Sequence, residues 1–155
     1  MRYWLMKSEP DTFGIDDLAG ASQQTTSWEG VRNYQARNML RDEMKVGDLA
    51  FFYHSSCAEP GVAGVIEVVR AGYPDPSAWN PRSPYFDAKS PANKPLWYTV
   101  DVRLQQRAAQ VLPLSVLREH AARELDGLLL LRRGNRLSIT PLAAAHWKFI
   151  RALLR

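Results

Sequence analysis

The sequence predicts an α+β fold, in which a small barrel-like sheet carries peripheral helices. Strand-like segments dominate, and the helical segments are inserted or appended without the regular alternation that marks a parallel doubly wound sheet. The 155 residues include no low-complexity stretch, and their number suits a single compact core. We therefore expect one globular domain over residues 1–155.

The N-terminal segment is expected to contain one strand and one brief helix. Tyr3–Met6 is a short apolar and aromatic run that predicts a strand, and Lys7–Pro10, where proline ends strand pairing, is predicted to lead into a polar loop. Ile15–Ala19 fits a brief helix. Gly20–Ser27 is polar and is predicted to be a loop.

A helix of about three turns is expected after Asn33, which is a good N-cap residue. The pattern stops at Gly47, so the helix is predicted to end before it. Its apolar positions recur at helical spacing and are Ala36, Met39, Leu40 and Met44.

The middle of the chain contains three predicted strands and one long loop. Leu49–Tyr53 and Val62–Val69 are β-prone runs separated by a short polar connection, as in neighbouring antiparallel strands. Residues 72–96 contain too many prolines for regular structure, while their aromatic residues argue against disorder. Tyr98–Gln105 alternates between apolar and polar residues, which is typical of a strand with one wet face.

The C-terminal part is predicted to be mainly helical. One helix is expected from Pro113 through His120, whereas Leu128–Leu131 is too short to assign to helix or strand. Thr140 as N-cap and Pro141 at the first helical position predict an amphipathic terminal helix. Its apolar positions are Leu142, Ala145, Phe149, Ile150 and Leu153.

Composition narrows the possible partners and locations. The net charge is +4, with 6 basic and 9 acidic groups in residues 1–60 but 14 and 7 in residues 61–155. A basic balance favours polyanionic partners without proving them. Cys57 is the only cysteine, which excludes an internal disulfide. No apolar run approaches the roughly 20 residues of a membrane span, so we expect a cytosolic protein of the bacterial cytosol or nucleoid.

The segment Trp28–Arg37 gathers an indole, a phenol, an amide and two guanidiniums around a glycine at a loop-to-helix junction. These groups suit a splayed-out nucleobase, since aromatic faces stack on it, amides address its edge and arginines hold flanking phosphates. Alternatively, Trp28 and Tyr34 are packing residues, and Arg32 and Arg37 belong to a solvated helix face. Spacing alone slightly favours this second interpretation.

Other polar segments add candidate site residues of lower specificity. Lys7–Glu9 and Tyr53–Ser56 come at the ends of predicted strands, and strand ends commonly border a binding site. Nothing shows a base oriented for nucleophilic catalysis by Ser55 or Cys57, and the histidines have no recognised metal-ligand spacing. The basic turn Arg132–Arg136 suits a phosphate backbone or a solvated surface loop about equally.

Four segments in order along the chain make the sequence resemble the EVE domain family. They are Tyr3–Pro10, Trp28–Asn38, Phe52–Ser55 and Arg136–Ile139, the last with Ser138. This family is similar to PUA-like barrels and, more distantly, to YTH readers of methylated adenine. The resemblance implies a PUA-like β-barrel of five or six mostly antiparallel strands with helices around it.

The resemblance also implies a pocket for one base. Its residues would be Lys7, Ser8, Trp28, Val31, Arg32, Asn33, Tyr34 and Arg37, with Tyr53, His54 and Ser55 opposite and Trp79, Tyr85 and Asp87 closing it from the long loop. The phosphate contacts would be Arg32, Arg37, Arg132, Arg133 and Arg136.

We therefore expect a monomeric, non-enzymatic reader of DNA or RNA that carries a modified cytosine or adenine, without metal, cofactor or membrane contact. Trp28 and a loop aromatic would stack on the base, while Ser8 and Asn33 would address its edge. A hydrolase acting on a modified nucleobase or nucleoside is the alternative, with Lys7, Glu9 or His54 in acid or base roles. The proline-rich loop leaves a protein-interaction module as a third hypothesis.

Overall fold

In a computed structural model of residues 1–155, six strands form one mixed sheet in the order β2-β5-β4-β3-β1-β6. Neighbouring strands are antiparallel, except that β1 and β3 are parallel. The strands are β1 (Tyr3–Ser8), β2 (Thr25–Ser27), β3 (Leu49–His54), β4 (Gly61–Pro74), β5 (Tyr98–Pro113) and β6 (Ile139–Leu142). The predicted α+β class with a barrel-like sheet is confirmed. The sheet is not closed, because β2 and β6 are its two edges.

Short helices surround the sheet. The α-helices are α1 (Pro10–Phe13), α2 (Ile15–Ala19), α3 (Tyr34–Asn38), α4 (Leu114–Glu119) and α5 (Ala144–Leu153). A π-helical turn, η2 (Met39–Glu43), continues α3, and 3-10 turns lie at η1 (Ser22–Gln24), η3 (Pro76–Trp79) and η4 (Leu129–Leu131). None of these helices has the length and apolarity needed to cross a membrane.

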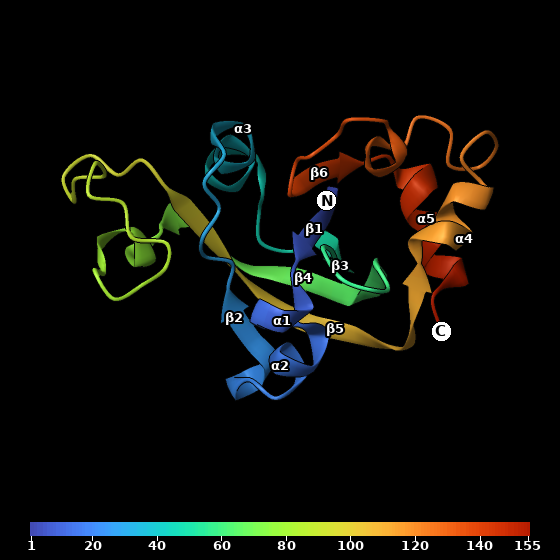
Figure 1. Ribbon diagram of the computed structural model, residues 1–155, viewed down its shortest axis with the longest axis horizontal. Helices are drawn as coiled ribbons and strands as arrows, with labels where there is room; N and C mark the ends of the chain where they lie inside the picture. Colours follow the sequence, from blue (N-terminus) through green and yellow to red (C-terminus); the bar gives the residue numbers. More distant parts are fainter.

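The long strand β5 connects the two ends of the molecule (Figure 1). It begins beside the loop that follows β4 and ends at α4, close to α5 and the C-terminus. The N-terminal strand β1 lies between these ends, and α1 and α2 lie together on one side. The long loop and the C-terminal helices are therefore far apart.

The central strands β1, β3 and β4 are buried on both faces, which explains their continuous apolar runs. Successive side chains of a strand point to opposite faces, so Trp4 and Met6 enter one core while Leu5 enters the other. Phe52 and Phe51 divide in the same way. The first core also takes the apolar side of α3 and η2, and the second takes α4 and α5.

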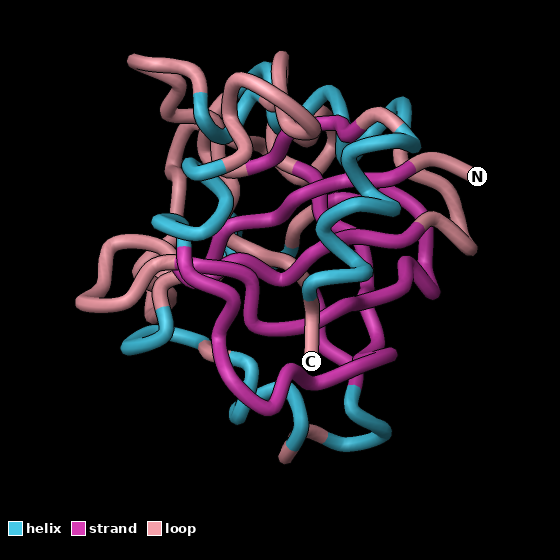
Figure 2. The backbone as a smooth tube through the Cα atoms, turned by 90° about the vertical axis from the view of Figure 1, so that its right-hand side faces the viewer, coloured by secondary structure: helices cyan, strands magenta, loops and turns pink.

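A stack of three aromatic rings fixes α5 to the sheet. The centroid of the Trp147 ring lies 4.1 Å from that of Phe51 and 4.7 Å from that of Tyr3, and the ring is nearly parallel to both. Figure 2 shows α5 running across the strands on this side. Trp147 and Phe51 are buried, so their contact is central to the second core.

Several predicted elements are confirmed with their boundaries extended. Asn33 is the N-cap of α3, and its side-chain oxygen accepts the Ala36 N–H at 3.0 Å. The helix over Ile15–Ala19 and the antiparallel pair β3 and β4 are present. The strand predicted over Tyr98–Gln105 continues to Pro113, and Leu128–Leu131 contains a 3-10 turn.

Three predictions of local structure were wrong. Thr140 and Pro141 lie in β6, and α5 begins only at Ala144; the proline is tolerated because β6 is an edge strand with one unpaired side. Gly20–Ser27 is not all loop, since its last three residues form β2 on the other edge. Pro10 does not lead into a loop but starts α1, where its missing N–H costs no helical hydrogen bond.

We predict that Phe51→Ala lowers the free energy of unfolding by about 3–5 kcal/mol, because it leaves a cavity beneath Trp147. Urea denaturation of the variant and the wild type measures this loss. Phe51→Leu keeps most of the side-chain volume and should lose less. A loss for Phe51→Ala below about 1 kcal/mol would show that the stack does not hold α5 in place.

Candidate functional site

A cleft with a volume of about 490 Å³ lies between the end of β1 and the edge strand β2. One wall comes from the end of β1 and from α1, and the other comes from β2 and the segment Trp28–Arg32. The long loop adds one side chain and the approach to β6 adds another. The lining residues are Lys7, Ser8, Glu9, Thr12, Phe13, Thr26, Ser27, Trp28, Glu29, Gly30, Val31, Arg32, Tyr85 and Ser138.

Backbone pairing positions the β1 side of the cleft. The Lys7 N–H donates to the Ser138 carbonyl at 2.8 Å, which holds Ser138 beside β1. The Ser8 hydroxyl donates to the Phe13 carbonyl at 2.6 Å and so fixes α1 against the strand end. These bonds order the polar rim of the cleft.

Trp28 lies at the base of the opposite wall. Its backbone N–H donates to the Val100 carbonyl at 2.8 Å, which extends the pairing of β2 with β5 by one residue. Its ring packs edge to face on Phe52, with 5.3 Å between centroids. Only 7% of Trp28 is exposed, so it belongs both to the first core and to the cleft.

Gly30 allows the long loop to close onto this wall. Its φ is +89°, and a Cβ at this position would lie 2.6 Å from the Tyr85 ring. A side chain is excluded on both counts, by the left-handed backbone and by the close approach of the ring. The Tyr85 ring can therefore line the cleft directly over the Gly30 backbone.

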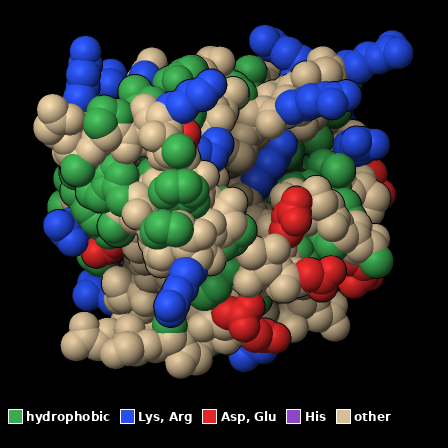
Figure 3. Space-filling model, turned by 60° about the vertical axis from the view of Figure 1, so that its left-hand side comes forward, with side chains coloured by type: hydrophobic (Ala, Val, Ile, Leu, Met, Phe, Trp, Pro, Cys, Tyr) green, Lys and Arg blue, Asp and Glu red, His purple; other side chains and the backbone are tan.

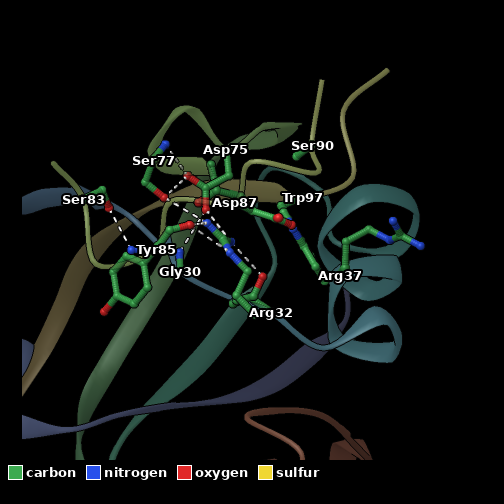
Figure 4. A network of polar contacts seen from close by, with 12 residues as sticks. Gly30, Arg32, Arg37, Asp75, Ser77, Ser83, Tyr85, Asp87, Ser90 and Trp97 are labelled. Carbon is green, nitrogen blue, oxygen red and sulfur yellow. Dashed lines mark hydrogen bonds and ion pairs between the residues drawn. The ribbon is translucent and has the colours of Figure 1, made fainter. Parts of the chain in front are cut away.

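The carboxylate of Asp75 joins the Trp28–Arg32 segment to the long loop (Figure 4). One oxygen accepts the Gly30 N–H at 2.9 Å and an Arg32 N–H at 3.1 Å. The other accepts the N–H and the hydroxyl of Ser77 at 2.9 Å and 2.6 Å. The Asp75 side chain is fully buried, and all of its acceptor positions face donors.

The guanidinium of Arg32 is committed to internal contacts. It also donates to the Tyr85 carbonyl at 2.6 Å, to the Ser77 hydroxyl at 3.3 Å and to the Val31 carbonyl at 3.0 Å. Its side chain is 23% exposed. Arg32 was predicted to be a phosphate contact, and the structure places its guanidinium in contacts that hold the long loop.

Two charged groups that line the cleft have pKa values shifted from their usual range. Burial lowers the pKa of the Lys7 amine below its usual range. Burial raises the pKa of Glu29, the charge of Asp75 raises it further, and Arg32 opposes the shift. Figure 3 shows one face of the molecule, on which basic side chains gather along the upper edge and acidic ones lie lower down beside further basic ones, with a hollow between. A ligand in the cleft meets both signs of charge.

Six of the predicted pocket residues line this cleft, and three from the start of α3 do not. The six are Lys7, Ser8, Trp28, Val31, Arg32 and Tyr85. Of the other three, Asn33 caps the helix, Tyr34 stacks on Trp97, and Arg37 donates to the Leu96 carbonyl. The helix thus turns these side chains away from the cleft.

The remaining five predicted pocket residues lie in the core or in contacts around the cleft. Tyr53 is buried in the second core, and burial raises its pKa to about 12. The Ser55 N–H donates to the Ser8 carbonyl, and the His54 ring accepts the Ile15 N–H. Asp87 accepts the Trp97 indole N–H at 2.7 Å, whereas the Trp79 indole nitrogen is buried without a partner. None of these five side chains lines the cleft.

The predicted pocket omitted several residues that the structure brings into the cleft. Glu9, Glu29, Gly30 and Ser138 lie inside the segments that carry the family resemblance, so that resemblance could have indicated them. Thr12, Phe13, Thr26 and Ser27 carried no comparable signal. The predicted phosphate contacts Arg132, Arg133 and Arg136 are exposed, on the loop that leads to Ser138.

We predict that Asp75→Asn lowers the free energy of unfolding by about 2–4 kcal/mol, because it leaves the partly buried Arg32 without its counter-charge. Urea denaturation followed by tryptophan fluorescence measures the loss. Asp42→Asn is the matched control, since it breaks an exposed pair with Arg41 and should behave like the wild type. Equal stability of the two variants would contradict a central role for Asp75.

His54 gives the fold a pH dependence of predictable sign. Its Nε2 accepts the Ile15 N–H at 3.1 Å, which requires the neutral ring. Burial lowers the pKa of His54 from 6.5, and Asp16 only partly opposes this. Because the unfolded state binds the proton more readily, stability is full above about pH 6.5 and falls as the pH drops through the folded pKa.

We therefore predict that the wild type loses more thermal stability than His54→Gln between about pH 7.5 and about pH 5. Glutamine keeps an acceptor for the Ile15 N–H but does not titrate. Melting temperatures of both proteins at the two pH values test this. An identical loss in the two proteins would rule out His54 as its source.

Comparison with known proteins identifies relatives along the whole chain. The EVE domain family matches residues 2–153. Thymocyte nuclear protein 1 of Gallus gallus is 42% identical over 97% of this chain and 68% of its own length. A Pseudomonas putida crystal structure is 50% identical, with a TM-score of 0.91 over 97% of this chain and 98% of that one.

A further solved structure is that of the human THYN1 protein in complex with DNA that contains 5-methylcytosine. It is 40% identical, with a TM-score of 0.93 over 99% of this chain and 97% of that one. The family match and the near-complete coverage of this chain by these relatives agree with the order of the motifs. The chain belongs to the EVE domain family.

Proposed function

We propose that this protein binds DNA containing 5-methylcytosine and receives the modified base in the cleft between β1 and the Trp28–Arg32 segment. The observation that carries the proposal is the near-identity of fold with the human THYN1 protein, which was crystallised with such DNA. The cleft supports it, since about 490 Å³ lies in the range of about 300–1,000 Å³ common for small-ligand sites.

The lining of the cleft suits a methylated pyrimidine. Trp28, Val31 and Phe13 offer apolar surface for the ring and the methyl group, and Tyr85 offers a third aromatic side chain. A base that leaves the duplex loses its stacking, which aromatic side chains replace at about 1–3 kcal/mol per base. Stacking alone does not select cytosine.

The polar side chains of the cleft address the edge of the base. Cytosine presents an amino donor at N4, whereas thymine presents a carbonyl oxygen at the same position. The carboxyl groups of Glu9 and Glu29 can accept from that amino group, and the Lys7 amine can donate to a base carbonyl or a phosphate. This set of groups favours 5-methylcytosine over thymine, although both carry the methyl group.

The basic turn after η4 is the proposed phosphate contact. Arg132, Arg133 and Arg136 are exposed and form no ion pair within the chain, unlike Arg32. Their loop leads directly to Ser138 at the rim of the cleft. Each phosphate they neutralise should make binding more sensitive to salt.

A hydrolase is the second candidate, because one observation favours it. Lys7 and Glu29 share the cleft and have pKa values shifted toward neutrality, a pattern that is frequent at catalytic sites. We propose binding without turnover. Mass spectrometry of methylated DNA and of free 5-methyl-2′-deoxycytidine after incubation tests this, and a released or altered base would favour the hydrolase.

We predict that the wild type binds a methylated duplex more tightly than the same duplex with cytosine, and that Tyr85→Leu weakens methylated binding about tenfold through loss of one stacking contact. The backbone carbonyl of Tyr85, which Arg32 uses, is retained in this variant. Fluorescence anisotropy with both duplexes and with methylated RNA measures the preference.

Phe86→Leu is the matched control for this experiment. Phe86 is the neighbouring aromatic residue, is 43% exposed and does not line the cleft, so its variant should bind like the wild type. Equal wild-type affinity for the two duplexes would overturn recognition of the methyl group. Unchanged binding by Tyr85→Leu would instead overturn the placement of the base.

A further inference from the structure

A continuous row of planar groups in cation–π and stacking contact leads from the cleft to the outer surface of α3. The Arg32 guanidinium lies over two rings, with its central carbon 5.8 Å from the Tyr85 centroid and 5.3 Å from the Trp97 centroid. The Tyr34 ring stacks on Trp97 at 4.8 Å and 18°. The Arg37 guanidinium lies 4.8 Å from the Tyr34 centroid and ends the row. Tyr85 is thus its end at the cleft.

The outer end of this row is unusually open. Tyr34 is 55% exposed, whereas Trp97 behind it is buried. An exposed aromatic ring is normally mobile, but here Trp97 and Arg37 hold it in one orientation before any ligand arrives. Contacts made by such a preordered ring lose little conformational entropy on binding.

Arg37 carries a charge that nothing in the chain neutralises directly. Its guanidinium donates to two neutral groups, the Leu96 carbonyl at 2.6 Å and the Asn38 side-chain oxygen at 2.8 Å. Asp42 is itself paired with Arg41 at 2.8 Å, and its pKa is lowered first by that hydrogen bond and least by the charge of Arg37. Figure 4 shows the Arg37 side chain pointing away from the Asp75 network.

We propose that Tyr34 and Arg37 form a second DNA subsite outside the cleft, in which they stack on the base next to the modified one and contact the adjoining phosphate. This inference rests on the proposed function. Withdrawal of one base into the cleft leaves its neighbour unstacked on one side, and planar groups such as a phenol or a guanidinium replace that lost contact. Because the row is continuous, the subsite lies at a fixed position relative to the cleft.

A double-mutant cycle between protein and DNA tests this inference. One change is Tyr34→Leu, and the other replaces the nucleotide on one side of 5-methylcytosine by an abasic site, on the 5′ and 3′ sides in turn. We expect Tyr34→Leu to weaken binding about tenfold, and an abasic site to do the same on one of the two sides of 5-methylcytosine. On that side, the variant protein with the abasic DNA should bind no more weakly than either single change alone. Anisotropy with single-stranded methylated oligonucleotides provides the affinities.

Further variants separate the subsite from a loss of structure. Tyr34→Phe keeps the ring and should bind like the wild type, as should the exposed aromatic control Phe86→Leu. Arg37→Gln should reduce the slope of the logarithm of affinity against that of salt concentration by about 0.7, the value for one phosphate in a single strand. Melting temperatures of all variants confirm that they are folded.

The outcomes distinguish a failure of the second subsite from a failure of the proposed function. If the wild type binds methylated DNA but Tyr34→Leu does not weaken it, or if its effect adds to that of each abasic site, the second subsite is wrong and the proposed function stands. If the wild type shows no preference for methylated DNA, the proposed function itself fails.

Discussion

The buried carboxylate of Asp75 is the contact on which the functional half of the molecule depends. It binds the backbone of Gly30, the guanidinium of Arg32 and both donors of Ser77. Together with the hydrogen bonds from Arg32 to the Tyr85 carbonyl, these bonds hold the proline-rich loop against the wall of the cleft. A buried charge is tolerated only when it is paired and fully hydrogen-bonded, and Asp75 meets both conditions. Its negative charge also contributes to the raised pKa of Glu29.

The open seam of the sheet explains where the cleft lies. The central strands β1, β3 and β4 are covered by a core on each face, so they leave no space for a ligand there. The edge strands β2 and β6 are not paired with each other, and the cleft takes residues from β2 and from the position just before β6. A closed barrel would have paired these edges and left no such opening. The lack of pairing between β2 and β6 is therefore the structural feature that positions the site.

The sequence allowed much of the fold to be predicted, and the errors have physical causes. Asn33 was identified as a cap from its residue type, and this succeeded because the capping bond is local and joins its side chain to the Ala36 N–H. Thr140 and Pro141 have the same local signature as a helix start, but pairing with β1 places them in a strand. That pairing joins residues more than 130 positions apart, and local patterns contain no information about it.

The site could be predicted only in part for a similar reason. Lys7, Ser8 and Trp28 were identified within motifs, and they do line the cleft. Tyr53 lies directly opposite Lys7 in the parallel pair, yet its side chain enters the second core. Since Phe52 shares a core with Trp28, strand alternation already indicates that Tyr53 points the other way. The role of Arg32 depends on Asp75, which is distant in sequence and whose partners no motif revealed.

The most direct measurement of the central proposal follows the methyl group itself. DNA carrying a 13C-labelled methyl group on 5-methylcytosine can be titrated with the protein and examined by nuclear Overhauser spectroscopy. A base held in the cleft gives cross-peaks from the methyl protons to the Trp28 indole and the Tyr85 ring. A base that remains stacked gives cross-peaks only to neighbouring nucleotides, and that result would contradict the proposal.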